Sequence, residues 1–322
     1  MRLSSTMIIL LIFIALSVGC VPQINSTPTS TPLPNITLTS TPTPFIETIE
    51  GTFRNQIKYL EENMPRANSE GYVVPTGKEQ QDFAELVAML GTQDLVRAAQ
   101  LAMQNNYTLI NYRDRGDDNA MNYLLRENKP IQKGWGLYAF RVDSTSNIII
   151  QAPHPLYDRR TPTVAMDIYR ALNARALLIA GSHRNANADG SADAAHTTES
   201  IFHSVHEALA HEMQAGSEQV IILQIHGYHT SKHTGYPQAV FGFGENIEAP
   251  EFAIGQRLKY ALIEQRIKIG LCDGHVWQDL CGTTNAQGST TNGAIFIHIE
   301  LDENIRKNDK ALVAALVQVF GK

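Results

Sequence analysis

The sequence predicts an α/β fold, specifically a three-layer sandwich with a largely parallel or mixed sheet, preceded by a small N-terminal helical region. Three short apolar runs at 147–152, 176–180 and 219–225 suit strands that are covered on both faces. A fourth run at 294–299 alternates in the manner of a strand. Segments with helical spacing separate these runs, and such alternation is typical of helices packed on both faces of one sheet.

Two helices are predicted between the strands. Thr161-Pro162 has the pattern of an N-cap followed by proline at the first helical position. An apolar stripe follows it at Val164, Ala165, Ile168, Ala171 and Leu172. The segment 199–214 has a similar stripe at Ile201, Phe202, Val205, Ala208 and Leu209. His203, His206 and His211 fall on its other side, and we expect them to be solvated.

The N-terminal region, residues 51–133, shows helical periodicity at 80–89 and 94–104. It offers no residues with evident chemistry, so we interpret it as a packing subdomain, with a gatekeeping or pro-region role as the alternative. The α/β domain is predicted to span 134–322. Its apolar fraction of 43% and charged fraction of 18% are ordinary for a globular protein, and a net charge of −6 does not favour nucleic-acid binding.

Residues 1–20 have the layout of an export signal, with Arg2 before an apolar stretch at 7–18. The run 16–20 resembles a bacterial lipoprotein signal, which implies cleavage before Cys20 and lipid on that cysteine. A simple secretory signal is the alternative. The Thr/Pro/Ser-rich segment 21–50 is predicted to be an extended linker. We therefore expect an exported protein anchored to the outer face of the cytoplasmic membrane.

Cysteine usage agrees with export. Besides Cys20, the chain holds only Cys272 and Cys281, and an oxidising compartment favours a disulfide between them. A metal cluster with His275 is the rival interpretation, but this spacing does not match the usual intervals between zinc ligands.

Metal-binding and acid–base residues follow several of the predicted strands. His154 and Asp158 come after the first strand, His226 ends the third, and Glu300 ends the fourth. Ligands gather at the carboxyl ends of strands in such sheets. A catalytic zinc takes three protein ligands of the histidine and carboxylate type, which His154, Asp158 and His226 supply. Glu300 is then placed to act as the general base.

Further polar residues follow the same strand ends. Arg184 has the planar fork suited to a substrate carboxylate or a developing oxyanion, and we expect His183 and His229 to contact substrate as well. His196 and His233 are interpreted as supporting, substrate-facing or loop residues. Asp167 and Glu199 are alternative carboxylates. The turn-rich stretch 281–293 either lines the cleft or is a loop braced by the disulfide.

The order of His154 with its nearby carboxylate, the segment 183–187, Gln224-Ile225-His226-Gly227 and a late Glu300 resembles the zinc-carboxypeptidase-like fold. Within that group the order is similar to N-formylglutamate amidohydrolases and N-acetylmuramoyl-alanine amidases. The resemblance covers about residues 134–322. It implies one zinc ion held by two histidines and a carboxylate, a glutamate base and an amide substrate. One departure is that three residues separate His154 from Asp158, whereas carboxypeptidases have two between histidine and glutamate.

These observations predict a zinc-dependent hydrolase of amide or peptide bonds that acts outside the cytoplasm, on wall-derived or scavenged peptide. A metal-dependent esterase or phosphoesterase would use the same ligands. A lipoprotein that binds a ligand or a metal without turnover is the alternative from another class, and it would have no need of Glu300 beside the metal.

Overall fold

The computed structural model describes residues 46–216, 219–244, 249–273, 275–291 and 293–321. Residues 43–322 form one compact unit. The predicted signal, Cys20 and most of the linker lie outside the described residues. The linker prediction extended to residue 50, but a strand, β1, begins within it at Thr48, where Ile49 packs on the core and Glu50 pairs with Arg115.

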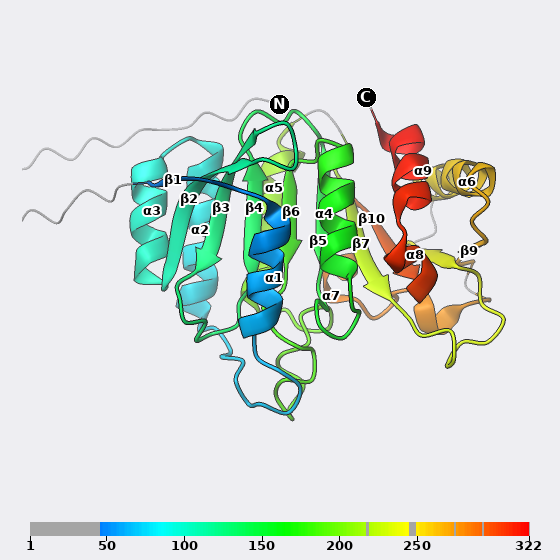
Figure 1. The fold of residues 1–322 in the computed structure, drawn as a ribbon, viewed down its shortest axis with the longest axis horizontal. Helices are drawn as coiled ribbons and strands as arrows, with labels where there is room; N and C mark the ends of the chain where they lie inside the picture. Colours follow the sequence, from blue (N-terminus) through cyan, green and yellow to red (C-terminus); the bar gives the residue numbers. More distant parts are fainter. Residues whose placement is uncertain (1–45, 217–218, 245–248, 274, 292, 322) are drawn as a thin grey trace, which may run out of the picture. The chain divides into compact units, whose positions relative to one another are not determined.

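A ten-stranded mixed sheet forms the middle layer of the unit, in the order β1-β2-β3-β4-β6-β5-β7-β10-β8-β9 (Figure 1). The five strands β4, β6, β5, β7 and β10 form its centre. The strands are β1 (Thr48–Gly51), β2 (Tyr107–Asp114), β3 (Ala120–Glu127), β4 (Leu137–Arg141), β5 (Ile148–Ala152), β6 (Ala176–Ile179), β7 (Ile221–Gly227), β8 (Ala239–Gly242), β9 (Ile269–Leu271) and β10 (Ile295–Leu301).

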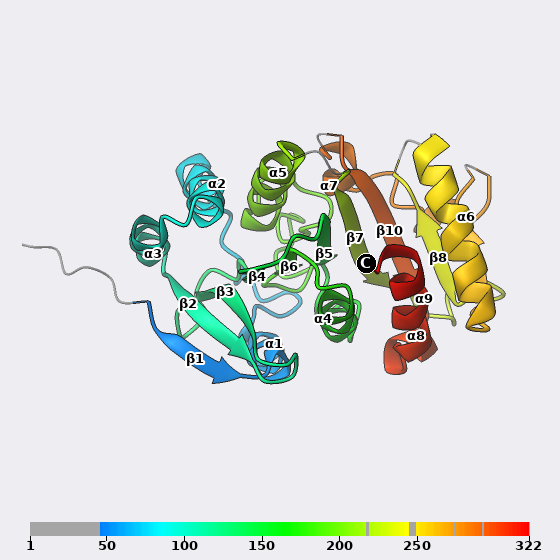
Figure 2. The same ribbon diagram turned by 90° about the horizontal axis from the view of Figure 1, so that it is seen from above.

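Helices cover both faces of this sheet, which makes the three-layer sandwich that the sequence predicts (Figure 2). One face packs on α1 (Phe53–Asn63), α4 (Thr161–Ala171), α6 (Ala249–Glu264) and α9 (Lys310–Phe320), with the short α8 (Glu303–Lys307) beside α9. The other face packs on α2 (Gly77–Gly91), α3 (Leu95–Gln104) and α5 (Ile201–Gln214). A short helix, α7 (Ala286–Ser289), and a 3-10 turn (Gln278–Leu280) complete the described elements. Within the described part of the chain, no helix combines the length and apolar character needed to cross a bilayer.

The four predicted strands correspond to β5, β6, β7 and β10, and each is parallel to its neighbours within that group. Their burial on both faces explains why apolar runs identified them. The predicted N-cap of α4 is displaced by one residue, because the helix begins at Thr161 and Arg160 occupies the cap position with φ 75°. The turn that joins Thr161 N to Asp158 O at 3.1 Å places Arg160 in this left-handed conformation.

The region expected to be helical, 51–133, also contains the hairpin β2–β3. These strands extend the same sheet, because β3 pairs with β4. The buried carboxylate of Glu127 accepts backbone N–H groups from four consecutive residues, 132 to 135, at 2.6–3.4 Å. The N-terminal region and the α/β region predicted from the sequence therefore share one sheet and one set of buried hydrogen bonds.

Candidate metal centre

Two buried histidines and a buried aspartate meet beyond the carboxyl ends of β5 and β7. His154 lies two residues after β5, and His226 is the penultimate residue of β7. Asp158 N donates to His154 O at 2.9 Å, so a single helical turn places the two side chains on one side of the chain. This turn explains how three intervening residues still bring His154 and Asp158 together.

Asp158 Oδ2 lies between the two imidazoles, 3.3 Å from His154 Nδ1 and 3.4 Å from His226 Nδ1. All three side chains are almost fully buried. These separations exceed the about 2.7–2.9 Å of a charge-assisted N–H···O bond. They match the spacing of about 3.3–3.6 Å between ligand atoms that sit about 2.0–2.2 Å from a tetrahedral zinc ion. The donor set and its spacing therefore fit a zinc ion.

The other ring nitrogens of both histidines make short hydrogen bonds. His154 Nε2 lies 2.8 Å from Asp193 Oδ1, and His226 Nε2 lies 2.7 Å from Gln224 Oε1. Both oxygens can only accept, so each Nε2 carries the proton and donates it. A neutral ring of this tautomer presents the lone pair of Nδ1 towards Asp158. Metal-binding histidines are generally oriented in this way by a carboxylate or carbonyl on the far nitrogen.

Asp193 links this centre to the loop that follows β6. Arg184 Nη2 lies 2.5 Å from Asp193 Oδ2, and His196 Nδ1 lies 3.2 Å from Asp193 Oδ1. The Arg184 guanidinium also lies over the ring of Tyr157, 5.2 Å from its centroid. His154, Asp193 and His196 form a second grouping with metal-ligand character. The shortest separation in this group, 2.8 Å between His154 Nε2 and Asp193 Oδ1, is that of a hydrogen bond. We therefore interpret Asp193 and His196 as residues that support His154 rather than as metal ligands.

The charges of the centre follow from burial and from these contacts. Burial raises the pKa of Asp158, but His154 and His226 outweigh it and hold that pKa well below its usual range. His154 and His196 likewise hold the pKa of Asp193 well below its usual range, although burial raises it. Burial lowers the pKa of His226 to about 4, despite its contact with Asp158. Burial also lowers the pKa of His154, but its two aspartate partners prevail and raise it. An ionised Asp158 therefore faces a neutral His226.

Glu300 and His298 complete the centre from β10. The register pairs Glu300 with His226 and His298 with Gln224 across the two strands. The His298 ring stacks on that of His226, with centroids 4.2 Å apart. Glu300 Oε2 and His298 Nδ1 are enclosed and have no hydrogen-bond partner among the described residues. Burial and the nearby Asp158 raise the pKa of Glu300 well above its usual value. Both side chains thus hold unsatisfied polar atoms at the centre.

Buried amide side chains support the His226 ring, beginning with Gln224 at its Nε2 atom. Gln224 donates to Gln151 Oε1 at 2.9 Å and to Gln287 Oε1 at 3.2 Å, and its own Oε1 also accepts from Asn285 Nδ2. Gln151 Nε2 reaches His206 Nδ1 at 2.9 Å, while Gln287 Nε2 reaches Ala194 O at 2.9 Å. We call Gln151, Gln224, Asn285 and Gln287 the amide network. It connects β5, β7 and α7 beneath the metal centre.

The prediction that His203, His206 and His211 are solvated is wrong for the first two. His203 and His206 are buried, because the amide network gives the inner side of α5 polar partners to contact. Gln287 Nε2 lies 3.2 Å from His203 Nδ1. His211, one turn further along α5, is exposed as expected.

The remaining predicted residues lie further from the three ligands. His183 is half-buried, and its ring lies 5.6 Å from that of Tyr157. His229 is exposed and pairs with Glu303 at 2.7 Å, while His233 pairs with Asp279. Of the alternative carboxylates, Asp167 pairs with Arg54 and Arg170, and Glu199 is exposed. The structure therefore groups His154, Asp158, His226 and Glu300, with Arg184 held by Asp193 beside them.

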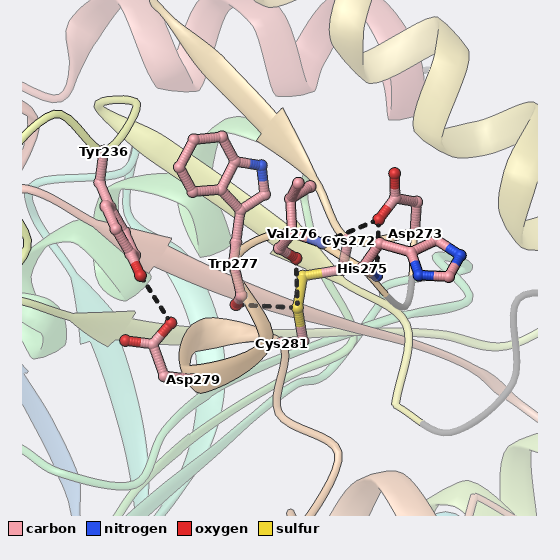
Figure 3. Close-up of a disulfide and its surroundings, with 8 residues drawn as sticks. All are labelled: Tyr236, Cys272, Asp273, His275, Val276, Trp277, Asp279 and Cys281. Carbon is pink, nitrogen blue, oxygen red and sulfur yellow. Dashed lines mark hydrogen bonds between the residues drawn. A yellow bond between two sulfur atoms is a disulfide. The ribbon is translucent and has the colours of Figure 1, made fainter.

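Cys272 and Cys281 form a disulfide, with their Cα atoms 5.8 Å apart (Figure 3). Since each sulfur is bonded to the other, no thiolate is left for a metal at His275. Cys281 leads into Gly282, whose backbone packs so closely on His298 that an added Cβ would lie 2.5 Å from the ring. The stretch after the disulfide thus contacts the centre through Gly282 and the amide network through Asn285.

Sequence reasoning missed Asp193, Gln224 and the remaining amides. Asp193 lies 39 residues after its partner His154, within an irregular loop that gives no periodic signal. Gln224 gave a usable signal, because a glutamine inside an apolar strand, two residues before His226, must point to the same face. Gln151 offered the same signal in β5.

No protein-family model matches the sequence, and no curated protein matches it. Solved structures resemble it only remotely. An N-formylglutamate amidohydrolase from Ralstonia eutropha JMP134 is 10% identical, with a TM-score of 0.38 over 56% of this chain and 96% of its own. A succinylglutamate desuccinylase from Chromobacterium violaceum is 12% identical, with a TM-score of 0.36 over 69% and 73%. A metallo-carboxypeptidase from Burkholderia cenocepacia is 12% identical, with a TM-score of 0.37 over 57% and 59%.

Proposed function

We propose that this chain is a zinc-dependent hydrolase of amide or peptide bonds. The observation that carries the proposal is the arrangement of Asp158 Oδ2 between two Nδ1 atoms at 3.3 and 3.4 Å. The far nitrogens of both rings are occupied by Asp193 and Gln224, so the near nitrogens are directed at the carboxylate. His154, Asp158 and His226 would hold the ion. Three protein ligands leave one position for water, as in catalytic zinc sites.

A zinc ion in this position would lower the pKa of its water and polarise the substrate carbonyl. Glu300 lies across from His226, and within the described part of the chain one of its enclosed oxygens has no hydrogen-bond partner. The burial that raises its pKa makes this carboxylate a stronger base than a solvated one. It accepts the proton of the attacking water and returns it to the leaving amine, which would otherwise depart as an unstable anion.

Arg184 is the group that would bind the negative charge of the substrate. Its Nη2 atom pairs with Asp193 Oδ2, and the side chain is about a quarter exposed. A guanidinium held by one carboxylate keeps its planar fork oriented for a second anion. It is therefore placed to bind either a substrate carboxylate or the oxyanion that forms at the carbonyl carbon.

The place of action is part of the same proposal. The layout of residues 1–20 and the linker support an enzyme that is anchored through lipid at Cys20 and acts on peptide outside the cytoplasm. Palmitate incorporation that depends on Cys20 is the test. If Cys20→Ala leaves membrane association of the full chain unchanged, the anchor is wrong and a simple secretory signal replaces it.

The proposal predicts about one zinc per chain in protein purified without chelator or nickel resin. His226→Ala and His154→Ala should each lose that zinc, because each removes one of three ligands. His229→Ala is the matched control, since His229 is exposed and pairs with Glu303 away from the three ligands. Elemental analysis gives the result directly. Full zinc content in either ligand variant would refute the assigned site.

Hydrolysis then separates the classes of function. Zinc binding with turnover of acyl-amino-acid or peptide substrates supports the proposal. Turnover of esters or phosphoesters alone would assign the same ligands to a different reaction. Zinc binding without turnover of any of these substrates would make the chain a metal-binding lipoprotein.

A further inference from the structure

A cavity of about 720 Å³ lies on the α1–α4 face of the sheet, and its lining includes Pro155 and Arg159, which are next to His154 and Asp158 in the sequence. Its walls carry five cationic side chains, Arg54, Lys58, Arg66, Arg159 and Arg160. We propose that this cavity, called here the cationic pocket, binds an anionic segment of the substrate next to the bond that is cleaved. The assignment of the bound segment to a substrate rests on the proposed function, whereas the binding of anions does not.

The charge of the pocket is opposite to that of the chain. The whole sequence has a net charge of −6, yet the pocket lining holds five cations against Glu61 and Glu62. Lys58 and Glu62 are 3.8 Å apart and mostly exposed, so their pairing is weak. Burial raises the pKa of Glu61 above its usual value, and the nearby Arg66 and Arg160 act against that shift. The pocket therefore presents a concentrated positive field on an otherwise acidic protein.

A buried arginine, Arg306, contacts the loop that carries Arg159 and Arg160. Arg306 donates to Arg159 O at 2.7 Å, and Arg160 Nε donates to Arg306 O at 2.8 Å. Arg306 is itself almost fully buried. The first bond holds the backbone at Arg159 and the second orients the Arg160 side chain, so ordering these groups adds little to the cost of binding an anion.

Residues that line the pocket lie beside the candidate metal ligands in sequence and through ring contacts. Arg159 directly follows the ligand Asp158, and His183 lines the pocket. The His183 ring contacts Tyr157 at 5.6 Å, and Tyr157 in turn contacts His154 at 6.4 Å between centroids. A substrate whose amide lies at the metal centre would therefore extend past Tyr157 into the pocket.

The pocket defines a chemical class of ligand. Guanidinium groups bind carboxylate and phosphate through paired N–H donors. A volume of about 720 Å³ is larger than one carboxylate requires and suits a short segment with several charged groups. We therefore expect an amide substrate that carries two or more carboxylates or phosphates beyond the cleaved bond.

The cationic pocket gives α1 a function. Arg54 and Lys58 lie one turn apart on α1, and Arg66 follows that helix. The sequence offered no chemistry for this region, but its helix supplies one wall of the pocket. The wall is fixed to the site loop, because His183 N donates to Pro65 O at 2.9 Å.

Binding to the metal-free protein tests the pocket separately from hydrolysis. Tetraglutamate, tetraglutamine and inorganic tripolyphosphate are the probes, measured by calorimetry at low salt. We expect at least one anionic probe to bind about tenfold or more tightly than tetraglutamine. Whichever of tetraglutamate and tripolyphosphate binds more tightly identifies carboxylate or phosphate as the natural group.

Variants then locate the binding. Arg54→Gln/Lys58→Gln should weaken binding of the anionic probe about three- to tenfold, because it removes two of five cations. Arg97→Gln/Lys259→Gln removes the same charge from α3 and α6, outside the pocket, and should leave binding unchanged. Equal losses in both variants, or no preference for anionic probes, would overturn the inference. Anion binding without zinc-dependent turnover would instead refute the proposed function and leave the pocket standing.

Discussion

Glu300 differs from the other carboxylates around the candidate metal centre because one of its oxygens is enclosed and has no hydrogen-bond partner among the described residues. Asp158 and Asp193 each have two histidine contacts, which keep them ionised. Glu300 has no such histidine contact in the described structure, and burial raises its pKa. A group that gains a proton readily is suited to transfer one, whereas the aspartates are suited to hold a cation and to orient His154.

Glu300→Gln should therefore keep the zinc and lose the reaction. The substitution preserves the size and one oxygen of the side chain but removes its basicity. We expect turnover to fall by about 10²- to 10⁴-fold, the usual contribution of a positioned general base. Steady-state kinetics with elemental analysis of the same preparation provide the measurement. Unchanged turnover would remove Glu300 from the mechanism.

His206 provides a test of the buried polar residues through pH. Burial and the neighbouring His203 lower its pKa to about 3, so the folded protein holds it neutral, while the unfolded chain protonates it below about 6.5. Its contribution to stability is complete above pH 6.5 and is lost as the pH falls towards 3. Between pH 7 and pH 5 the loss is about 2 kcal/mol.

His206→Gln keeps an acceptor for Gln151 and removes the titration. Urea unfolding at pH 7 and pH 5 should show a smaller fall in unfolding free energy for this variant than for the wild type. His211→Gln, on the exposed side of the same helix, is the control and should behave as the wild type. An equal pH dependence in all three proteins would contradict the buried, neutral state of His206.

At the scale of elements, β7 supplies the candidate metal ligand His226 and the residue that supports it from one face of the sheet. Gln224 and His226 are two residues apart, so both point to the α5 side of the sheet, where the amide network lies. The partners of Gln224 use both of its amide donors and its oxygen. The strand therefore fixes not only the position of His226 but also which of its nitrogens carries the proton.

Gln224→Met should disturb this orientation while keeping the size of the side chain. Removing a hydrogen bond behind a metal ligand weakens metal binding about 10- to 100-fold. Nitrogen-15 NMR of the metal-free protein should also show His226 losing its preference for the Nε2–H tautomer, which a loss of packing alone would not cause. A preserved tautomer together with unchanged zinc affinity would show that Gln224 does not position His226.

The elements themselves could be predicted where one physical signal dominated. The apolar runs of β5, β6 and β7 and the alternation in β10 identified the parallel centre, and the helical spacing of apolar residues identified α2 to α5. The hairpin β2–β3 was not predicted. Its segments, such as Tyr107–Asp114, mix polar and aromatic residues in a pattern that fits neither a helix nor a fully buried strand. Strand ends predicted the candidate ligands, but Asp193 depends on the path of an irregular loop, which no local pattern specifies.

At the scale of the whole molecule, the N-terminal region is built into the sheet that carries the site. The predicted boundary after residue 133 falls among the four N–H groups that Glu127 binds. Phe83 and Tyr107 from the N-terminal region pack against Trp135 and Tyr138 from the other side of that boundary. A cut there would expose β4 and a buried aromatic cluster.

Residues 134–322 expressed alone should therefore fail to fold into a native state, whereas residues 46–322 should fold. The shorter chain should show no cooperative thermal transition by circular dichroism and poor protection in hydrogen exchange. The longer chain serves as the control in both measurements. A cooperative transition in the shorter chain would show that the N-terminal region is an accessory rather than part of the core.

The two outermost strands of the sheet, β1 and β9, are only four and three residues long. Exposed strand edges are where protein molecules add to one another and aggregate, and short, charged edges discourage this. Glu50 on β1 already engages Arg113 and Arg115 of its own chain. Both ends of the sheet are thus protected from edge-to-edge self-association, a hazard that the proposed lipid anchor would increase by crowding the chains on a membrane surface.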